Sequence, residues 1–282
     1  MRRAVRSLVI GVVAAALAAP ALARAPHRIL SMNLCADLLL LQLAPRARIV
    51  SVSHLAHEGA QTLFPGRDAG IAINHGAAED IVNLKPDLIL VGDTSTPMTR
   101  ALARRVGARV VEVKSANSLA EARAIILRLG DDIAERPRAA SLVARFDLTL
   151  AALAARPAQR RPRVIAWSGG AFVPGAGSLI DDIIAKAGAD NLAARPGGAG
   201  SAFDVEALIA ARPDALLYGA ERSGPPSLHN AQSQHRLVRR LYARRSIAYN
   251  DVAATCGLPQ SADAARDLRA ALDRLPTRSL TP

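Results

Sequence analysis

Aromatic residues are scarce in this sequence of 282 residues. They make up 3% of it, with one Trp, three Tyr and four Phe. So few aromatic side chains cannot line a binding pocket on every side. A flat ligand would stack on only one or two of them. The hydrophobic fraction is nevertheless 50%, which is enough to bury a large core and excludes a disordered chain.

Several catalytic signatures are also missing. The glycine-rich stretch Gly197–Gly200 follows no predicted strand and lacks the lysine of a phosphate-binding loop. The sequence has no Gly-x-Ser-x-Gly elbow, and no nucleophile is evident beside its histidines. We therefore expect no enzyme activity, no catalytic residue and no resident metal or cofactor.

Lysine occurs only three times, so the formal net charge of +12 comes from arginine. Such a charge raises nucleic acid or an anionic membrane as a partner. The basic run Arg236–Arg245 interleaves arginines with Leu237, Val238 and Leu241. This is the pattern of an amphipathic helix whose charged face lies in water. A second possibility is that some of these arginines face an anionic ligand.

The first 23 residues have the pattern of a secretory signal peptide. Three arginines precede the apolar run Leu8–Leu22, and Ala21-Leu22-Ala23 matches a cleavage signal. A membrane anchor is the alternative, but the run is short for one, and no other stretch could cross a bilayer. We expect export to the periplasm, which removes cytoplasmic nucleic acid as a partner.

Short apolar runs alternate with helical patterns along the rest of the chain, which predicts an α/β fold. The predicted strands are 28–32, 48–52, 87–91, 109–113, 163–167, 214–218 and 246–249. The predicted helices are 34–44, 78–84, 97–106, 178–187, 204–211, 229–242 and 261–275.

The stretch between residues 118 and 155 has almost no strand signal. Ser118 and Glu121 form a capping box at its start, and Pro137 suits the first turn of a second helix, Arg138–Ala155. We interpret this second helix as a linker between two lobes. The expected organisation is a signal peptide (1–23), an N-terminal lobe (24–136), a linker helix (137–160) and a C-terminal lobe (161–282).

The two halves of the chain share a repeated segment. Glu79–Gly92 and Glu206–Gly219 both run from a glutamate through a helix and a basic residue to Pro-Asp, a buried strand and a glycine. Glutamate favours the first turn of a helix, and the residue before proline rarely stays helical. The repeat predicts two similar Rossmann-like lobes. Parallel sheets bind ligands at their carboxyl edges, so we expect a ligand cleft between the lobes.

Three segments carry a resemblance to a known family: Arg28–Asn33, Glu79–Ile89 and Gly175–Asp182. Through them the sequence resembles the periplasmic substrate-binding proteins of ABC importers, in the group that takes up cobalamin, ferric siderophores or heme. The resemblance covers essentially the whole chain after the signal peptide. It implies two lobes joined by a single long α-helix, which permits only modest closing around the ligand.

In that family a surface glutamate on each lobe docks onto arginines of the membrane permease. The matching residues here are Glu79 and Glu206, which begin the two copies of the repeat. The other interpretation is that each glutamate only complements a helix N-terminus, a contribution of about 0.3–1 kcal/mol. The resemblance implies a permease dimer in the inner membrane as the partner of a monomeric protein.

Loop residues that directly follow strands are the candidate ligand contacts. They are Asn33, Cys35, His54, His57, His75 and Asp93 in the N-terminal lobe, and Trp167, Phe172, Phe203, Tyr218 and Cys256 in the C-terminal lobe. Trp167 and Phe172 offer flat apolar faces for a ring system. The alternative for these two rings is packing between the lobes.

Three histidines of the N-terminal lobe raise the question of a metal ligand set. With a carboxylate, His54, His57 and His75 would suit an importer of free zinc or manganese; otherwise they are exposed loop residues. Heme-binding relatives carry an axial tyrosine in the loop before the helix that begins near Glu79. This sequence has only His75 there, which favours other chelates over heme.

The two cysteines, Cys35 and Cys256, fall in different predicted lobes. An exported pair usually forms a disulfide, which here would span or flank the cleft. Two alternatives stay open. The thiols could have a low pKa at helix N-termini and face the ligand, or they could be buried and inert.

These observations predict capture of a metal chelate, with cobalamin or a ferric siderophore as the expected ligand, and its delivery to an ABC permease. One alternative is a binding protein for free zinc or manganese with a similar shape. Another, from a different class, is an exported enzyme that uses the same fold around a metallocofactor.

Overall fold

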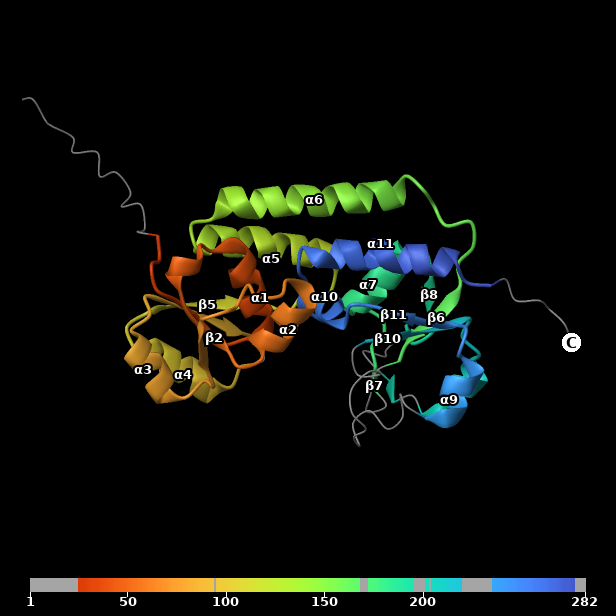
Figure 1. Ribbon diagram of the computed structural model, residues 1–282, viewed down its shortest axis with the longest axis horizontal. Coiled ribbons are helices and arrows are strands. Elements are labelled where there is room, and N and C mark those ends of the chain that lie inside the picture. Colours follow the sequence, from red (N-terminus) through yellow and green to blue (C-terminus); the bar gives the residue numbers. More distant parts are fainter. Residues whose placement is uncertain are drawn as a thin grey trace, which may run out of the picture.

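The computed structural model describes residues 25–93, 95–167, 172–194, 201–202, 204–219 and 235–276. They form two lobes that lie side by side beneath a layer of long helices (Figure 1). The predicted fold class, two similar α/β lobes with a connecting helix, is confirmed. The predicted signal peptide and residues 229–234 of one predicted helix lie outside the described residues.

The sheet of the N-terminal lobe is parallel throughout, in the order β3-β2-β1-β4-β5. Its strands are β1 (Ile29–Ser31), β2 (Ile49–Ser53), β3 (Ala72–Asn74), β4 (Leu88–Gly92) and β5 (Arg109–Val113). Strands buried on both faces have continuous apolar runs, which makes β1, β2 and β4 predictable. β3 is absent from the predicted strands because it is short and Ile73 is 51% exposed.

Helices cover both faces of this sheet. Along β4, Leu88 and Leu90 pack on the side of α1 (Leu34–Leu43) and α2 (Ala56–Leu63). The alternate residues Ile89 and Val91 pack on the side of α3 (Ala78–Leu84) and α4 (Pro97–Arg105). This alternation follows from the two-residue period of a strand. The α3–α4 side lies at the bottom of Figure 1, away from the long helices.

The sheet of the C-terminal lobe is also parallel, in the order β11-β10-β6-β8. Its strands are β6 (Arg163–Ala166), β8 (Asp190–Asn191), β10 (Ala215–Tyr218) and β11 (Ser246–Ala248). A separate antiparallel pair consists of β7 (Phe172–Val173) and β9 (Ser201–Ala202).

Helices lie on both faces of the second sheet as well. One core contains residues of α7 (Leu179–Lys186), α10 (Asp251–Cys256) and α11 (Gln260–Asp273). The core on the other face contains Leu208 of α8 (Val205–Ala211), together with Val238 of α9 (Arg236–Leu241) and Tyr242, which follows α9. Thus α8 and α9 form one layer, as α3 and α4 do in the first lobe.

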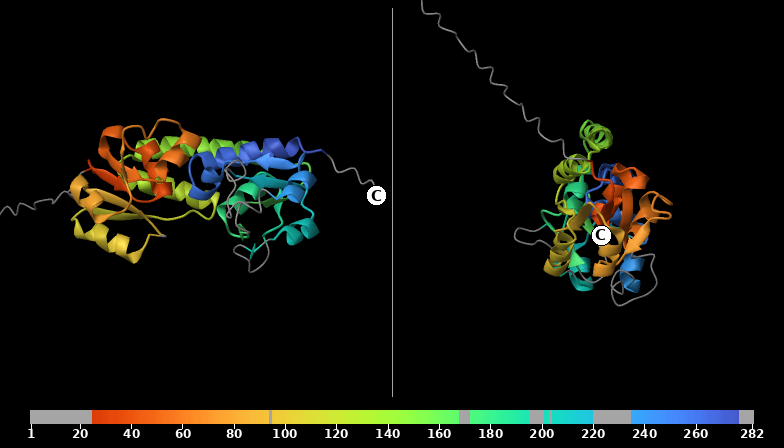
Figure 2. Two further views of the ribbon diagram at one scale, coloured as in Figure 1. Left: turned by 60° about the horizontal axis from the view of Figure 1, so that its bottom comes forward. Right: turned by 90° about the vertical axis from the view of Figure 1, so that its left-hand side faces the viewer.

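Two antiparallel helices connect the lobes (Figure 2). α6 (Arg136–Ala154) is the predicted linker helix, with Val143 in the core of the first lobe and Phe146 in that of the second. α5 (Leu119–Asp132) also spans both lobes, since Leu119 packs in the second core and Ile126 in the first. The connection is therefore wider than one helix.

α6 has 19 residues, a length that could cross a bilayer, but it carries charged side chains on several turns. Within the described part of the chain, no helix is both long and apolar enough to cross a membrane.

The two copies of the repeat have the same local structure. The basic residues Lys85 and Arg212 end α3 and α8 in the left-handed conformation, with φ of 43° and 46°. Before β1, Arg28 donates hydrogen bonds to the carbonyls of Leu84 and Lys85. At the start of β6, Arg163 donates likewise to the carbonyl of Arg212. The repeat thus includes an arginine at the beginning of each lobe.

Candidate functional site

A cavity of about 540 Å³ lies between the two lobes. Its walls are residues that follow β1 and β5 in the first lobe and β11 in the second, together with parts of α7 and α10. Loops at the carboxyl edges of two parallel sheets therefore meet here, which is where such sheets bind ligands. The cavity lies where the sequence predicts the ligand cleft.

A disulfide bond between Cys35 and Cys256 lines this cavity. Cys35 lies in the first turn of α1 and Cys256 at the end of α10, 221 residues apart. The described chain has no free cysteine, so the two thiol alternatives do not apply to this structure. The idea that both cysteines start helices is wrong for Cys256, because α10 ends there.

The rest of the lining combines apolar side chains with a few polar ones. The polar residues are Ser115 and Asn117 after β5, Ser178 at the N-cap of α7, Tyr249 and Asp251 after β11, and Thr255 on α10. Among the described lining residues, Asp251 is the only one with a formal charge. Such a lining suits a ligand that is held by apolar contact and oriented by a few hydrogen bonds.

Tyr249, Asp251 and Thr255 are absent from the candidates chosen by sequence. The rule that selects loop residues after strands identifies Asp251 when it is applied to the predicted strand 246–249, but it does not identify Tyr249, which is the last residue of that predicted strand. Thr255 has no comparable signal, because the six residues of α10 are too few for a helical pattern.

Asn33 has a positioning role beside the cavity. Its Oδ1 accepts hydrogen bonds from the backbone N–H groups of Cys35 (3.1 Å) and Ala36 (3.2 Å), so it caps α1. Its side chain also lies against Gly92, where a Cβ atom would overlap Asn33 Nδ2. Asn33 is not a lining residue; it fixes the start of α1, and with it Cys35, beside β4.

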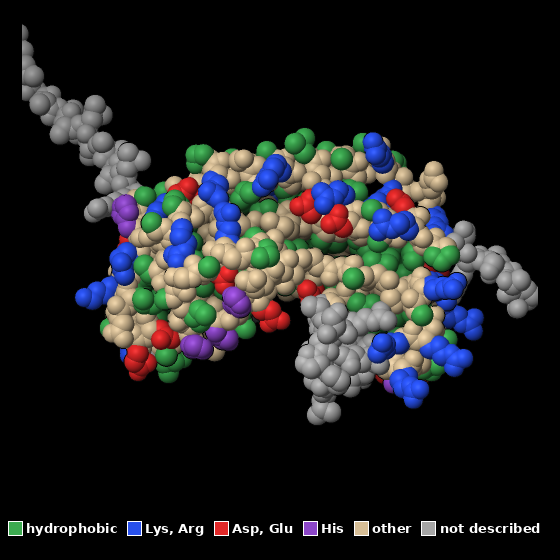
Figure 3. Space-filling view, viewed as in Figure 1, with side chains coloured by type: hydrophobic (Ala, Val, Ile, Leu, Met, Phe, Trp, Pro, Cys, Tyr) green, Lys and Arg blue, Asp and Glu red, His purple; other side chains and the backbone are tan. Residues whose placement is uncertain are grey.

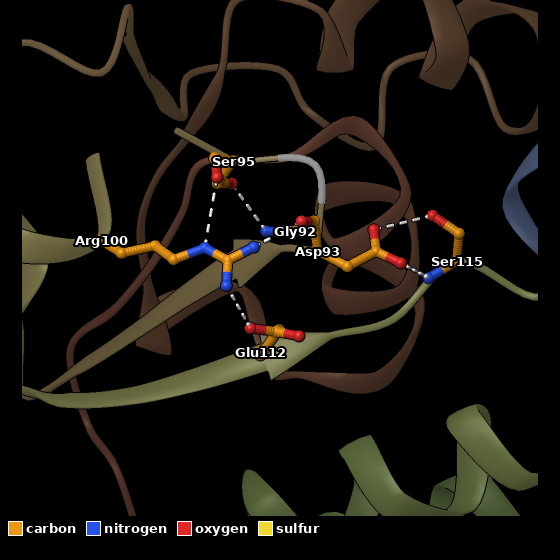
Figure 4. A network of polar contacts seen from close by, with 6 residues as sticks. All are labelled: Gly92, Asp93, Ser95, Arg100, Glu112 and Ser115. Atoms are coloured by element: carbon orange, nitrogen blue, oxygen red, sulfur yellow. Dashed lines mark hydrogen bonds and ion pairs between the residues drawn. The ribbon is translucent and has the colours of Figure 1, made fainter. Parts of the chain in front are cut away.

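Asp93 holds the loop that contains Ser115 in place through hydrogen bonds (Figure 4). Its carboxylate accepts hydrogen bonds from the backbone N–H (2.9 Å) and the hydroxyl (2.8 Å) of Ser115. Arg100 of α4 donates to the carbonyl of Asp93 and forms an ion pair with Glu112 at 2.9 Å. Asp93 therefore acts on the cavity through Ser115 and is not itself part of the wall.

The three histidines do not converge. His54 and His75, after β2 and β3, are both exposed and stack with ring centroids 5.2 Å apart and planes at 12°. His57 instead lies with Nδ1 2.6 Å from Asp68 Oδ2. The described residues contain no group of three His, Cys, Asp or Glu side chains that could hold a metal ion. Figure 3 shows histidine side chains at the lower edge of the N-terminal lobe.

Trp167 and Tyr218 lie in the core of the C-terminal lobe, with exposed fractions of 1% and 2%. Both belong to the core that includes Val238, on the α8–α9 side of the sheet. In this structure Trp167, which was expected to stack on a ligand or to pack between the lobes, is packed inside the C-terminal lobe, and the candidate contact Tyr218 is buried beside it in the same core. Phe172 begins β7, and Phe203 lies outside the described residues.

A buried carboxyl group lies beside the end of β2, the strand that His54 follows. Asp37 of α1 accepts hydrogen bonds from Ser53 through its hydroxyl (2.5 Å) and its backbone N–H (3.2 Å). Burial raises the pKa of Asp37 to about 6, although the hydrogen bonds from Ser53 oppose the shift. Asn74 donates to Ser51 Oγ and to the carbonyl of Ser31, both at 2.9 Å. These polar contacts tie together the ends of β1, β2 and β3.

Glu79 and Glu206 are exposed in the first turns of α3 and α8. These helices occupy equivalent layers of the two lobes. Neither glutamate forms an ion pair within the described structure. Each carboxylate is therefore accessible on the outer layer of its own lobe.

Comparison with protein families gives one match, to a model described as periplasmic binding protein, over residues 31–244. Comparison with curated proteins found no match.

Solved structures with the same fold include several periplasmic proteins. The periplasmic heme-binding protein RhuT from Roseiflexus sp. RS-1, in apo form, has a TM-score of 0.70 and 24% identity, covering 87% of this chain and 97% of that one. The periplasmic heme-binding protein HutB of Vibrio cholerae has a TM-score of 0.70 and 20% identity, with coverage of 87% and 98%. The periplasmic vitamin B12 binding protein BtuF of Vibrio cholerae has a TM-score of 0.64 and 18% identity, with coverage of 88% and 97%.

Proposed function

Because this chain belongs to the periplasmic binding protein family, we propose that it captures a metal chelate in the periplasm and delivers it to an ABC importer of the inner membrane. The observation that carries the proposal is the cavity between the lobes, formed by the carboxyl-edge loops of both sheets. Its volume of about 540 Å³ lies in the range of small-molecule sites. The protein binds and releases its ligand without making or breaking a bond.

The chemistry of the cavity supports cobalamin or a ferric siderophore as the ligand. Tyr249 supplies one aromatic side chain, and Asp251 and Thr255 supply hydrogen-bond acceptors. A corrin bears amide groups that donate to such acceptors, and a siderophore offers apolar and hydroxyl groups. The stacked pair His54 and His75 does not line the cavity, but it lies at the same carboxyl edge of the first lobe. There an imidazole nitrogen can occupy an open position on a chelated metal that extends beyond the cavity.

Free zinc or manganese is the second candidate, and the stacked pair is the observation that favours it. A bare zinc ion needs three or four protein ligands, whereas His57 is engaged with Asp68 in this structure. A chelated metal already has most of its ligands and needs one or two more. The pair therefore supports the chelate more strongly than the free ion.

Delivery to the permease assigns a role to Glu79 and Glu206. Their exposure and their equivalent places in the two lobes support docking onto a permease with two similar subunits. We expect a monomer in solution, because one chain already presents both glutamates.

Isothermal titration calorimetry with a panel of ligands tests the function. The panel contains cyanocobalamin, hemin, a ferric catecholate, a ferric hydroxamate, zinc and manganese. We expect saturable binding of one chelate, and we expect Thr255→Trp to abolish it by filling the cavity. Leu148→Trp is the matched control, since Leu148 is 70% exposed on α6 and does not line the cavity.

The outcomes separate the candidates. Binding of zinc or manganese alone would replace the chelate with the free-metal function. A chromophore that stays with the protein through purification and dialysis would point to an enzyme with a resident cofactor. Chelate binding that survives Thr255→Trp would place the site outside this cavity.

A further inference from the structure

The outer layer of the C-terminal lobe carries a basic surface with exposed leucines. We call it the α9 patch; it consists of Arg236, Leu237, Arg239, Arg240, Leu241 and Arg244. All four arginines are exposed, and Leu237 and Leu241 are 44% and 45% exposed. Figure 3 shows basic side chains gathered over α9 at the lower right of the molecule.

The rest of α9 explains why this surface points outward. Val238 and Tyr242 are buried at 0% and 5% and pack beneath the helix with Leu208 of α8. Residues three and four apart share a face of a helix, so burial of this pair turns the arginines and Leu237 to the other side. The patch is thus a helix face with charged and apolar groups side by side.

Among the residues that the structure describes, the four arginines of the patch have no charged partner. In the described structure none of them forms a hydrogen bond through its side chain or an ion pair. Several arginines elsewhere form ion pairs, as Arg48 does with Glu135 and Arg123 with Asp147. Four unpaired guanidinium groups within nine residues concentrate positive charge at this one place.

The patch shares its layer with Glu206. α8, whose first turn contains Glu206, and α9 cover the same face of the sheet, since Leu208 and Val238 lie in one core. On the proposed function, Glu206 meets the permease at the membrane. A surface in the same helical layer then lies near the lipid that surrounds the permease.

We propose that the α9 patch binds anionic phospholipid headgroups at the periplasmic surface of the inner membrane. Guanidinium groups pair with phosphate through parallel hydrogen bonds, and basic segments are attracted to an anionic bilayer within a Debye length of its surface. Leu237 and Leu241 sit beside the arginines, where they enter the interface once the charges have docked. The contact brings the loaded protein to the membrane and orients its outer layer toward the permease. The proposed membrane contact depends on two parts of the proposed function, namely export to the periplasm and docking through the face that contains Glu206. It does not depend on which chelate is bound.

An anionic bilayer fits this surface better than an acidic protein groove. The patch lies on an outward helix face and lines none of the described cavities. Protein interfaces are built around anchor residues that pack into pockets. The four arginines do not surround such a pocket in the described structure. Lipids diffuse in the plane of the bilayer, so a phosphate headgroup can take up a position next to each guanidinium group.

Co-sedimentation of the full chain with lipid vesicles tests the proposal. Vesicles of equal parts phosphatidylglycerol and phosphatidylcholine should bind the protein, and pure phosphatidylcholine vesicles should not. Arginine near an anionic surface contributes about fivefold in partitioning, so R236Q/R239Q/R240Q/R244Q should lower it on the order of 100-fold or more. About 1 M salt, with a Debye length of about 3 Å, should release the wild-type protein.

The control variant removes the same charge elsewhere. R128Q/R145Q/R156Q/R274Q changes four exposed arginines that also lack ion pairs in the described structure but lie on or beside α5, α6 and α11. This control should bind like the wild type. Equal losses in both variants would show a net-charge effect and overturn the proposal.

A second arm separates lipid from an acidic protein. Binding to immobilised polyglutamate without binding to anionic vesicles would assign the patch to a protein partner instead and overturn the lipid proposal. The titration with the chelate panel is measured separately on the same variants. A protein that binds its chelate but not vesicles would refute only the membrane contact, and one that binds vesicles but no chelate would refute only the proposed ligand.

Discussion

Cys35 of the first lobe and Cys256 of the second form a disulfide that lines the cavity between the lobes. The lobes are also connected by α5 and α6, whose residues pack into both cores. The lobes are thus joined both by a covalent bond and by helices. Closing around a ligand must be a small motion about these connections, which keeps the lining near its bound geometry and lowers the entropy lost on binding.

Removing this bond should destabilise the protein. A disulfide that closes a loop of more than 200 residues restricts the unfolded chain strongly, so Cys35→Ala with Cys256→Ala should lower the free energy of unfolding by about 3–5 kcal/mol. Urea denaturation followed by circular dichroism measures the change. Dithiothreitol should reproduce it in the wild-type protein and leave the double variant unaffected. Two free thiols in the denatured, unreduced protein would refute the bond.

Asp37 should make stability depend on pH. Its pKa is raised by burial to about 6 in the folded protein, above the ordinary value of 3.8. Between these values the folded state binds more protons than the unfolded state, so the contribution of Asp37 to stability falls as pH rises from about 4 to about 6. The shift corresponds to roughly 3 kcal/mol.

The measurement is the difference in unfolding free energy between the wild type and Asp37→Asn across that range. We expect the wild type to lose stability relative to the variant as pH rises, and the difference to level off above about pH 6. Asp273→Asn, at a carboxyl that is 67% exposed on α11, is the control. A flat difference for Asp37→Asn would mean that its carboxyl is not buried as described.

The repeat made most of the architecture predictable from sequence. In each lobe the glutamate of the repeat indicates the first turn of a helix. The basic residue before Pro-Asp indicates the end of that helix, and the apolar residues after Pro-Asp indicate the next strand. The residue before a proline avoids the right-handed helical region, which explains why α3 and α8 end at Lys85 and Arg212. The same rule predicts extended backbone there, so the left-handed conformation of these two residues was not predictable from sequence. Short elements such as β3 and α10 have too few residues for any period to show.

The site was less predictable because strand ends indicate an edge and not which side chains reach the cavity. Trp167 directly follows β6, one residue beyond the end of that strand, yet its side chain continues the two-residue alternation of the sheet and is buried in the core. Asn33 and Asp93 form local hydrogen bonds with Cys35 and Ser115 and do not line the cavity, and a single sequence does not reveal these hydrogen bonds. Thr255 depends on the packing of α10 against the other lobe.

The stacked histidines should matter for one class of chelate. His54→Ala or His75→Ala should weaken binding of a chelate with an open metal position, such as hemin, by roughly 10–100-fold, as when a metal site loses an organising group. A ferric hexadentate siderophore has no open position and should bind unchanged. His57→Ala is the matched control, because His57 contacts Asp68 instead. Calorimetry with both ligands measures these effects, and equal losses in all three variants would assign the histidines a purely structural role.

Charge reversal at the two exposed glutamates should block delivery while sparing capture. Glu79→Arg with Glu206→Arg places like charges against the arginines that the resemblance implies on the permease, and such a juxtaposition costs several kcal/mol. We expect uptake of the bound chelate, in cells that lack the native copy, to fall on the order of tenfold or more. Affinity for the chelate should stay unchanged, because neither glutamate lines the cavity.

The matched control reverses two acids on another surface. Asp263→Arg with Asp267→Arg changes the net charge equally, but these exposed residues lie on α11, among the long helices. Each forms a surface ion pair with Arg266, and such pairs contribute about 0–1 kcal/mol, so the control should fold and transport normally.

The two single variants test whether each glutamate contacts its own half of the permease. If Glu79 and Glu206 each contact one half of the permease, either reversal alone should reduce uptake, and the double variant should reduce it further. Normal uptake in the double variant would leave the two glutamates with no role beyond the first turns of α3 and α8.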